Sequence, residues 1–183
     1  MKIYSLILFF YLLAASCQGQ PVAENRIVKA TTGAAESEYE KGAISVGVVV
    51  SDLEKSLDFY TRVLGMQKTG GFKIDEDFGN RSGLSDGVPF EVTVLKLVDS
   101  PDAAEWKLLS FGKGATHPKQ LHIQDDTGVQ YVTLFVKAIQ PILERIRQNN
   151  IPLLGSTPVV LKDGRQFILI QDPDGTFIEL IGQ

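Results

Sequence analysis

The chain has 183 residues, of which 44% are hydrophobic, and its 18 basic and 22 acidic side chains give a formal net charge of −4. That length suits one domain large enough to bury a substantial core. The acidic balance excludes nucleic acid as an expected partner, and a single cysteine, Cys17, excludes an intramolecular disulfide.

The start of the chain has the pattern of an export signal. Residues 3–13 are apolar except for Ser5, a run with the length of a signal-peptide core but short for a membrane-spanning helix. The Leu-Ala-Ala-Ser-Cys of residues 13–17 resembles the lipobox of bacterial lipoproteins, which implies cleavage before Cys17 and lipidation of its thiol. We therefore predict a lipoprotein signal peptide over residues 1–16. The protein is then exported and lipid-anchored to a bacterial membrane, on its periplasmic or cell-surface side; plain secretion with a free thiol is the alternative.

Residues 17–42 are rich in Ala, Gln, Glu, Thr and Gly and show no sustained periodicity. This composition predicts a flexible tether that holds the rest of the chain off the membrane. The globular domain is then expected over residues 43–183.

The first part of this domain, about residues 43–112, has the pattern of one βαβββ module. β-Branched runs indicate strands, Asp and Gly mark the helix ends, and Gly, Pro and Asp mark turns. In chain order we expect a strand at 44–50, a helix from the N-cap Asp52 to Gly65, a strand at 67–74, a loop at 75–89, a strand at 90–97, a turn at 100–103 and a strand at 105–111.

The second part, about residues 129–183, has the same pattern after a connection at 112–128. The expected elements are a strand at 131–137, a helix at 139–149, segments at 151–154 and 159–161 that flank a bend, a strand at 165–171, a tight turn at 172–175 and a strand at 176–181. The sequence thus predicts an α+β fold of two paired modules.

The two modules are also a sequence repeat, since the text from Ser45 aligns without a gap on the text from Tyr131. In both first strands, alternation places aliphatic side chains on one face and a mixture of hydroxyl, glycine and aromatic side chains on the other. We expect the aliphatic faces to pack on the helices and the mixed faces to line a half-polar cavity.

Two motifs in the chain resemble a known family. Residues 50–65, Val-Ser-Asp-Leu-Glu-Lys-Ser-Leu-Asp-Phe-Tyr-Thr-Arg-Val-Leu-Gly, are similar to the opening helix signature of the vicinal oxygen chelate superfamily, and residues 172–179, Asp-Pro-Asp-Gly-Thr-Phe-Ile-Glu, to its closing motif. This superfamily contains glyoxalase I, extradiol dioxygenases and bleomycin resistance proteins. The resemblance implies that the two modules form a curled mixed sheet around a shared cavity.

Metal-binding members of this family place His or Gln, Glu, His and Glu at four positions, which correspond here to Ser45, Lys107, Tyr131 and Glu179. Only Glu179 is a metal ligand of the usual kind, and divalent metal sites in enzymes need about three anionic or imidazole donors. We therefore expect no metal and no other cofactor, with a divalent metal as the minor alternative.

The same substitutions suggest an ion pair. Lys107 and Glu179 hold equivalent places in the repeat, so we expect them to approach each other where the family holds its metal. The alternative is that Lys107 extends outward to solvent.

The candidate site residues follow from the strand faces that are expected to line the cavity. Glu179 and Tyr131 are the candidate catalytic residues, if there is any catalysis. Both histidines, His117 and His122, lie in the connection between modules and are expected in a solvated loop. The residues expected to line the ligand cavity are Ser45, Lys107, Tyr131, Thr133, Phe135, Phe177 and Glu179.

Three functions remain open at this point. The first is a module that binds a small molecule between its halves without turnover. The second is an atypical enzyme of the superfamily, a lyase, isomerase or dioxygenase, that uses Glu179 with unusual partners. The third is a scaffold whose cavity is filled by side chains. A homodimer is compatible with each of them.

Overall fold

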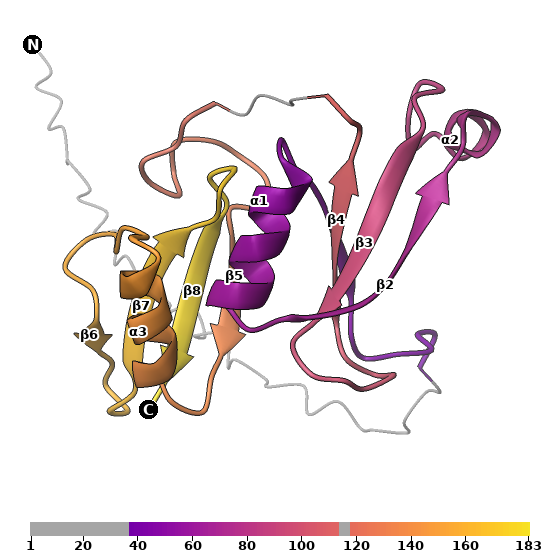
Figure 1. The fold of residues 1–183 in the computed structure, drawn as a ribbon. Coiled ribbons are helices and arrows are strands. Elements are labelled where there is room, and N and C mark those ends of the chain that lie inside the picture. The colour runs from indigo at the N-terminus through magenta and orange to yellow at the C-terminus, as the bar shows by residue number, and fades with distance from the viewer. Residues whose placement is uncertain (1–36, 114–117) are drawn as a thin grey trace, which may run out of the picture. The chain divides into compact units, whose positions relative to one another are not determined.

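The computed structural model describes residues 37–113 and 118–183, shown in colour in Figure 1. The predicted signal peptide, Cys17, most of the predicted tether and His117 lie outside the described residues. Within the described ranges, no helix is both long enough and apolar enough to cross a membrane.

Module one forms a four-stranded sheet in the order β1-β4-β3-β2. The first strand, β1, pairs in parallel with the last, β4, and the remaining neighbours are antiparallel. Its elements are β1 (Ser45–Val49), α1 (Leu53–Asp58), the short π-helix η1 (Phe59–Val63), β2 (Gln67–Ile74), α2 (Glu76–Ser82), β3 (Phe90–Lys96) and β4 (Glu105–Ser110).

Module two repeats this arrangement in a second four-stranded sheet, ordered β5-β8-β7-β6. Again the first strand is parallel to the last, and the others are antiparallel. Its elements are β5 (Tyr131–Phe135), α3 (Gln140–Gln148), β6 (Val159–Val160), β7 (Gln166–Gln171) and β8 (Phe177–Gly182). The predicted α+β fold of two βαβββ modules is confirmed.

The predicted loop at 75–89 was wrong in part, because its first half folds as α2. The Asp75 carboxylate accepts a hydrogen bond from the Phe78 amide at 2.8 Å, which caps the helix N-terminus. Gly83 adopts a left-handed conformation with φ of 74° at the other end. Asp75 and Gly83, which were taken as loop residues, are therefore helix caps here.

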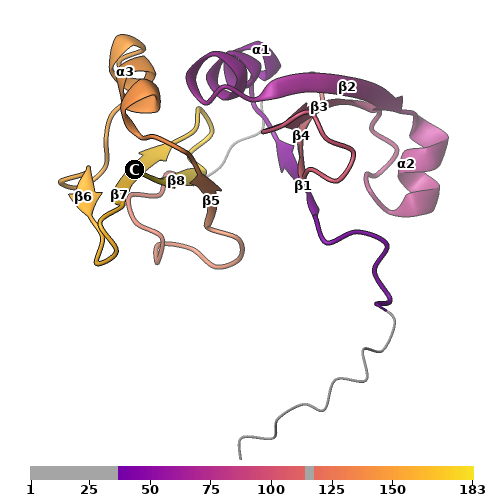
Figure 2. The ribbon, with the colours of Figure 1, turned by 90° about the horizontal axis from the view of Figure 1, so that it is seen from below.

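The two sheets do not close into one curled sheet. β1 and β5 are each an edge strand, and their described residues are not joined by ladder hydrogen bonds. Both edge strands, β1 and β5, can be followed in the view from below in Figure 2.

One apolar core underlies both modules. Arg145 of α3 donates to the Val63 carbonyl of η1 at 2.7 Å, so the two helical segments are in contact. The aliphatic faces of both sheets pack beneath them, as predicted. The most deeply buried members of this core are Tyr60, Leu95, Leu108, Ile139, Ile146, Ile168, Ile170, Ile178 and Leu180.

The turn between β7 and β8 binds module two to module one through two carboxylates. Asp172 accepts a hydrogen bond from the Tyr60 hydroxyl at 2.7 Å. Asp174 accepts one from the Ser56 hydroxyl at 3.2 Å and others from the Ser51 hydroxyl and amide. These contacts fix the opening helix motif against the closing turn motif and so hold the two strand edges in place.

Candidate functional site

A pocket of about 410 Å³ lies along the free edge of β1. One side is the backbone and side chains of β1, and the other comes from module two. The charged residue in its wall is Asp174, whose oxygens already accept hydrogen bonds from Ser51 and Ser56. The lining residues are Val46, Gly47, Val48, Val49, Ser51, Trp106, Val129, Val132, Asp174 and Thr176.

A second pocket of about 270 Å³ lies at the other end of the same edge. It shares Val46, Trp106 and Val132 with the first, so we call the two together the seam pockets. Its wall is apolar apart from Glu105 and Thr133. The lining residues are Ile44, Val46, Met66, Leu95, Leu97, Ala104, Glu105, Trp106, Val132, Thr133 and Leu134.

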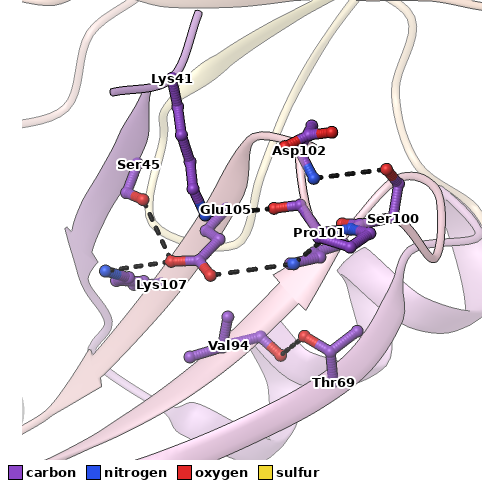
Figure 3. A network of polar contacts seen from close by, with 10 residues as sticks. Lys41, Ser45, Thr69, Val94, Ser100, Pro101, Asp102, Glu105 and Lys107 are labelled. Carbon is purple, nitrogen blue, oxygen red and sulfur yellow. Dashed lines mark hydrogen bonds and ion pairs between the residues drawn. The ribbon is translucent and has the colours of Figure 1, made fainter. Parts of the chain in front are cut away.

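Beside the second pocket, three polar side chains of module one converge on Glu105 (Figure 3). The Ser45 hydroxyl donates to Oε2 at 3.1 Å, and Lys107 Nζ lies 3.2 Å from the same oxygen. Lys96 Nζ lies 3.9 Å from Oε1. The Lys107 ammonium and the Ser45 hydroxyl hold the pKa of Glu105 below its usual value, so this carboxylate is ionised at neutral pH.

Module two holds Glu179 differently. Its Oε2 accepts a hydrogen bond from the Thr133 hydroxyl at 2.6 Å, across the β5–β8 ladder. Tyr131 and Phe135, on the same face, are 44% and 69% exposed, whereas Phe177 is only 1% exposed. On the mixed face of module two, Tyr131 and Phe135 are therefore open to solvent, whereas Phe177 is part of the buried interior.

The predicted ion pair between Lys107 and Glu179 is wrong, because the ammonium pairs with Glu105 on its own strand. Glu105 was missed, although it stands two residues before Lys107 and alternation puts both on one face. Of the seven predicted cavity residues, Thr133 lines a seam pocket; the other six lie outside both walls, and their contact with a ligand stays a prediction.

The remaining polar candidate, His122, lies in the loop before β5. Its side chain is 68% exposed, and its Nδ1 is 4.0 Å from an Asp125 oxygen. It lines neither seam pocket. The expectation of a solvated loop is confirmed for this histidine.

The profile of the glyoxalase/bleomycin resistance protein/dioxygenase superfamily matches residues 43–180. The chain belongs to this superfamily. A search of curated proteins found no match to the chain.

Solved structures of the superfamily share the fold at low sequence identity. A glyoxalase family protein from Bacillus cereus is 18% identical with a TM-score of 0.66, over 81% of this chain and 97% of its own. A glyoxalase/dioxygenase from Nostoc punctiforme is 17% identical with a TM-score of 0.54, over 76% and 88%. A glyoxalase I variant from Zea mays is 17% identical with a TM-score of 0.56, over 75% of this chain and 43% of its own.

Metal-binding members of the superfamily hold a divalent ion at the positions of Ser45, Lys107, Tyr131 and Glu179. Such an ion needs about three anionic or imidazole donors. Ser45 donates to Glu105, and Lys107 places an ammonium beside the same carboxylate. Glu179 supplies one carboxylate and Tyr131 a phenol. Within residues 37–113 and 118–183 there is no group of three His, Cys, Asp or Glu side chains arranged to hold a metal. These residues do not fit a Zn²⁺, Fe²⁺ or Ni²⁺ site, because the cation of Lys107 would repel the ion.

Proposed function

We propose that this superfamily member binds a small molecule at the seam between its two modules and does so without a divalent metal. The observation that carries the proposal is the pair of largely apolar seam pockets, of about 410 and 270 Å³. Their sizes fall near the lower end of the range for small-molecule sites, about 300–1,000 Å³. A few polar groups at the edge of an apolar wall are the usual means of orienting such a ligand.

We also propose that the protein is attached to a bacterial membrane. A lipid on Cys17 would tether the domain to a bacterial membrane on the periplasmic or cell-surface side, and two or more acyl chains would make that attachment stable. The partners are then a small-molecule ligand and the membrane, with either a monomer or a homodimer presenting the seam.

Ligand binding can be tested by thermal unfolding of the full-length protein against a library of small amphipathic compounds. A molecule that binds only the folded state raises the melting temperature, by an amount that grows with the logarithm of its concentration relative to its Kd. Replacing Val132 by Trp fills both pockets, and we expect it to abolish the shift given by the best compound.

The matched control is Val160→Trp, because Val160 is 75% exposed on β6 and lies outside the seam pockets. This variant should keep the full shift. If the broad library gives no binder, or if Val132→Trp binds as well as the native chain, the seam is not the ligand site.

A metal-free acid–base enzyme is the second candidate. It is favoured by Glu179, whose carboxylate is fixed by the Thr133 hydroxyl at 2.6 Å on the same face as Tyr131. Turnover of a seam ligand that is lost in Glu179→Gln while binding persists would support this candidate over simple binding.

A further inference from the structure

The free edge of β1 carries main-chain groups that have no partner strand in the described part of the chain. The Val50 amide donates to the Leu109 carbonyl at 3.0 Å, and the register pairs Val49 with Leu109. Because alternate residues of a strand bond to the same neighbour, the N–H and C=O of Val48 face β4, whereas those of Gly47 and Val49 face the seam. Such an unpaired edge is a template onto which another extended chain can add as a strand.

The first seam pocket, of about 410 Å³, lies directly at these unpaired groups. Gly47 is one of its lining residues and has no side chain, so it meets the pocket only through its main chain. Trp106 and Val132 line the same pocket and supply an apolar wall. A ligand in this one pocket is therefore in reach of both the strand edge and the apolar side chains.

One carboxylate, that of Asp174, lies in the wall where β1 ends. The Ser51 amide, two residues after β1, donates to Oδ1 at 3.2 Å, and the Ser56 hydroxyl donates to Oδ2 at 3.2 Å. Among residues 37–113 and 118–183, Asp174 forms no ion pair with a lysine, arginine or histidine. It is the only charged residue among the described ones that line the pocket. A cationic group of a ligand therefore finds a counter-charge there.

The position of Asp174 determines the direction in which a bound peptide runs. A strand antiparallel to β1 starts at the end where β1 finishes, so its amino terminus lies beside Asp174. A parallel strand would instead bring its carboxyl terminus to the same carboxylate, where two negative charges repel each other. The charge of the pocket therefore favours an antiparallel peptide whose amino terminus is free.

We propose that the first seam pocket binds a short apolar peptide with a free amino terminus, which adds to β1 as an antiparallel strand. Its main chain bonds to Gly47 and Val49, and its ammonium group contacts Asp174. Its side chains on one face lie against Trp106 and Val132. This inference rests on the proposed function, since it names the chemical class of the molecule held at the seam.

Trp106, the only tryptophan in the chain, lines the pocket, so its fluorescence should report binding. We would titrate the full-length protein with the tripeptide Val-Ala-Val, which extends over about 10 Å and so fits along the five residues of β1. The matched probes are its N-acetyl form, without the ammonium group, and its ester analogue, without main-chain N–H donors. The free tripeptide should bind about tenfold more tightly than either. High salt should reduce its advantage over the acetylated form.

Substitutions at Gly47 test the strand edge. Gly47→Pro removes the edge N–H and leaves the ladder with β4 in place, since proline is tolerated on edge strands. It should weaken the binding of the free and the acetylated peptide alike, by about tenfold. Gly47→Ala keeps this N–H, and its Cβ would lie 3.4 Å from the Leu109 side chain, so this variant should retain most of the affinity.

A substitution at Asp174 tests the charge. Asp174→Asn keeps an oxygen that accepts from Ser51, and it should weaken only the binding of the free peptide, to the level of the acetylated one. Asp86→Asn removes the same charge from an exposed loop outside the pocket and should change nothing. Thermal unfolding of each variant checks that it is folded.

Equal binding of the tripeptide and its ester analogue, unaffected by Gly47→Pro, would overturn strand addition while leaving the proposed binding function intact. Acetylated peptide that binds as tightly as the free form, with no change in Asp174→Asn, would overturn the assignment of the amino terminus. A native dimer, measured by light scattering, that Gly47→Pro dissociates would make the edge an interface between copies and overturn the inference. If none of the three probes changes the fluorescence, the inference fails, whereas the proposed function fails only when the broader library also yields no binder.

Discussion

Replacing Asp172 by Ala should lower the free energy of unfolding by about 3–5 kcal/mol, the largest effect we expect from a single polar substitution in this protein. Asp172 is 6% exposed. It accepts hydrogen bonds from the Tyr60 hydroxyl at 2.7 Å and from the amides of Asp174 and Thr176 at 3.0 and 2.8 Å. The truncation leaves all three donors without this acceptor and loosens the contact between the modules. Urea denaturation of the variant and the native chain measures the difference.

Tyr60→Phe is the matched control, because it removes one of the three hydrogen bonds and keeps the aromatic packing. It should cost about 1–2 kcal/mol. A loss near 1 kcal/mol for Asp172→Ala, no larger than that for Tyr60→Phe, would show that the closing turn does not hold the modules together.

The Asp172 carboxyl group should also make the stability of the folded protein depend on pH. Burial raises the pKa of Asp172, and the hydrogen bonds from Tyr60 and the Thr176 amide offset only part of that rise. A raised pKa means that the folded state binds the proton more tightly than the unfolded state. Its stabilising contribution is therefore complete below the unfolded pKa, about 3.9, and is lost as the pH rises through the folded value. The stability of Asp172→Asn relative to the native chain should accordingly increase with pH across this window.

Replacing Trp106 by Ala should cost about 3–5 kcal/mol and change ligand binding at the same time. Trp106 is 8% exposed, its ring centroid lies 5.5 Å from that of Tyr60, and it lines both seam pockets. Removing the indole takes packing from the core and enlarges both pockets. Denaturation gives the stability change, and calorimetric titration with a compound that binds the native chain gives the change in affinity.

Trp106→Phe separates the two effects. The indole N–H makes no hydrogen bond with any described residue. Burial and Asp172 raise the pKa of the neighbouring Tyr60 hydroxyl, and the indole N–H opposes that rise. Phe therefore removes an unsatisfied buried donor while keeping an aromatic ring, and should cost clearly less than Ala. Equal stability losses for Phe and Ala, with ligand affinity unchanged in both, would mean that Trp106 is not part of the site.

Much of the fold could be predicted because the strands are β-branched runs bounded by turn residues, and β2 falls at residues 67–74 as expected. The helix α2 was missed because Asp75 and Gly83 serve equally well as loop residues and as caps. Only the helix geometry distinguishes the two roles.

The site was less predictable for a different reason. Alternation gives the face of a side chain but not its partner, so Lys107 was matched with its repeat equivalent Glu179 instead of its strand neighbour Glu105. The repeat shows that two residues hold the same place in their own modules, not that they meet. The seam pockets are lined by aliphatic residues such as Val46 and Val132. They depend on how the edges of β1 and β5 approach each other, which the alternation within one strand does not reveal.

The most direct test of the central claim, ligand binding without a divalent metal, is the metal content of the full-length protein purified after expression with Zn²⁺, Fe²⁺, Mn²⁺ and Ni²⁺ available. Measured beside the Glu179→Ala variant, the native chain should hold no metal above trace, and the variant should match it. A stoichiometric metal that is lost in Glu179→Ala would contradict the account and make a metal-dependent enzyme of the superfamily the leading function.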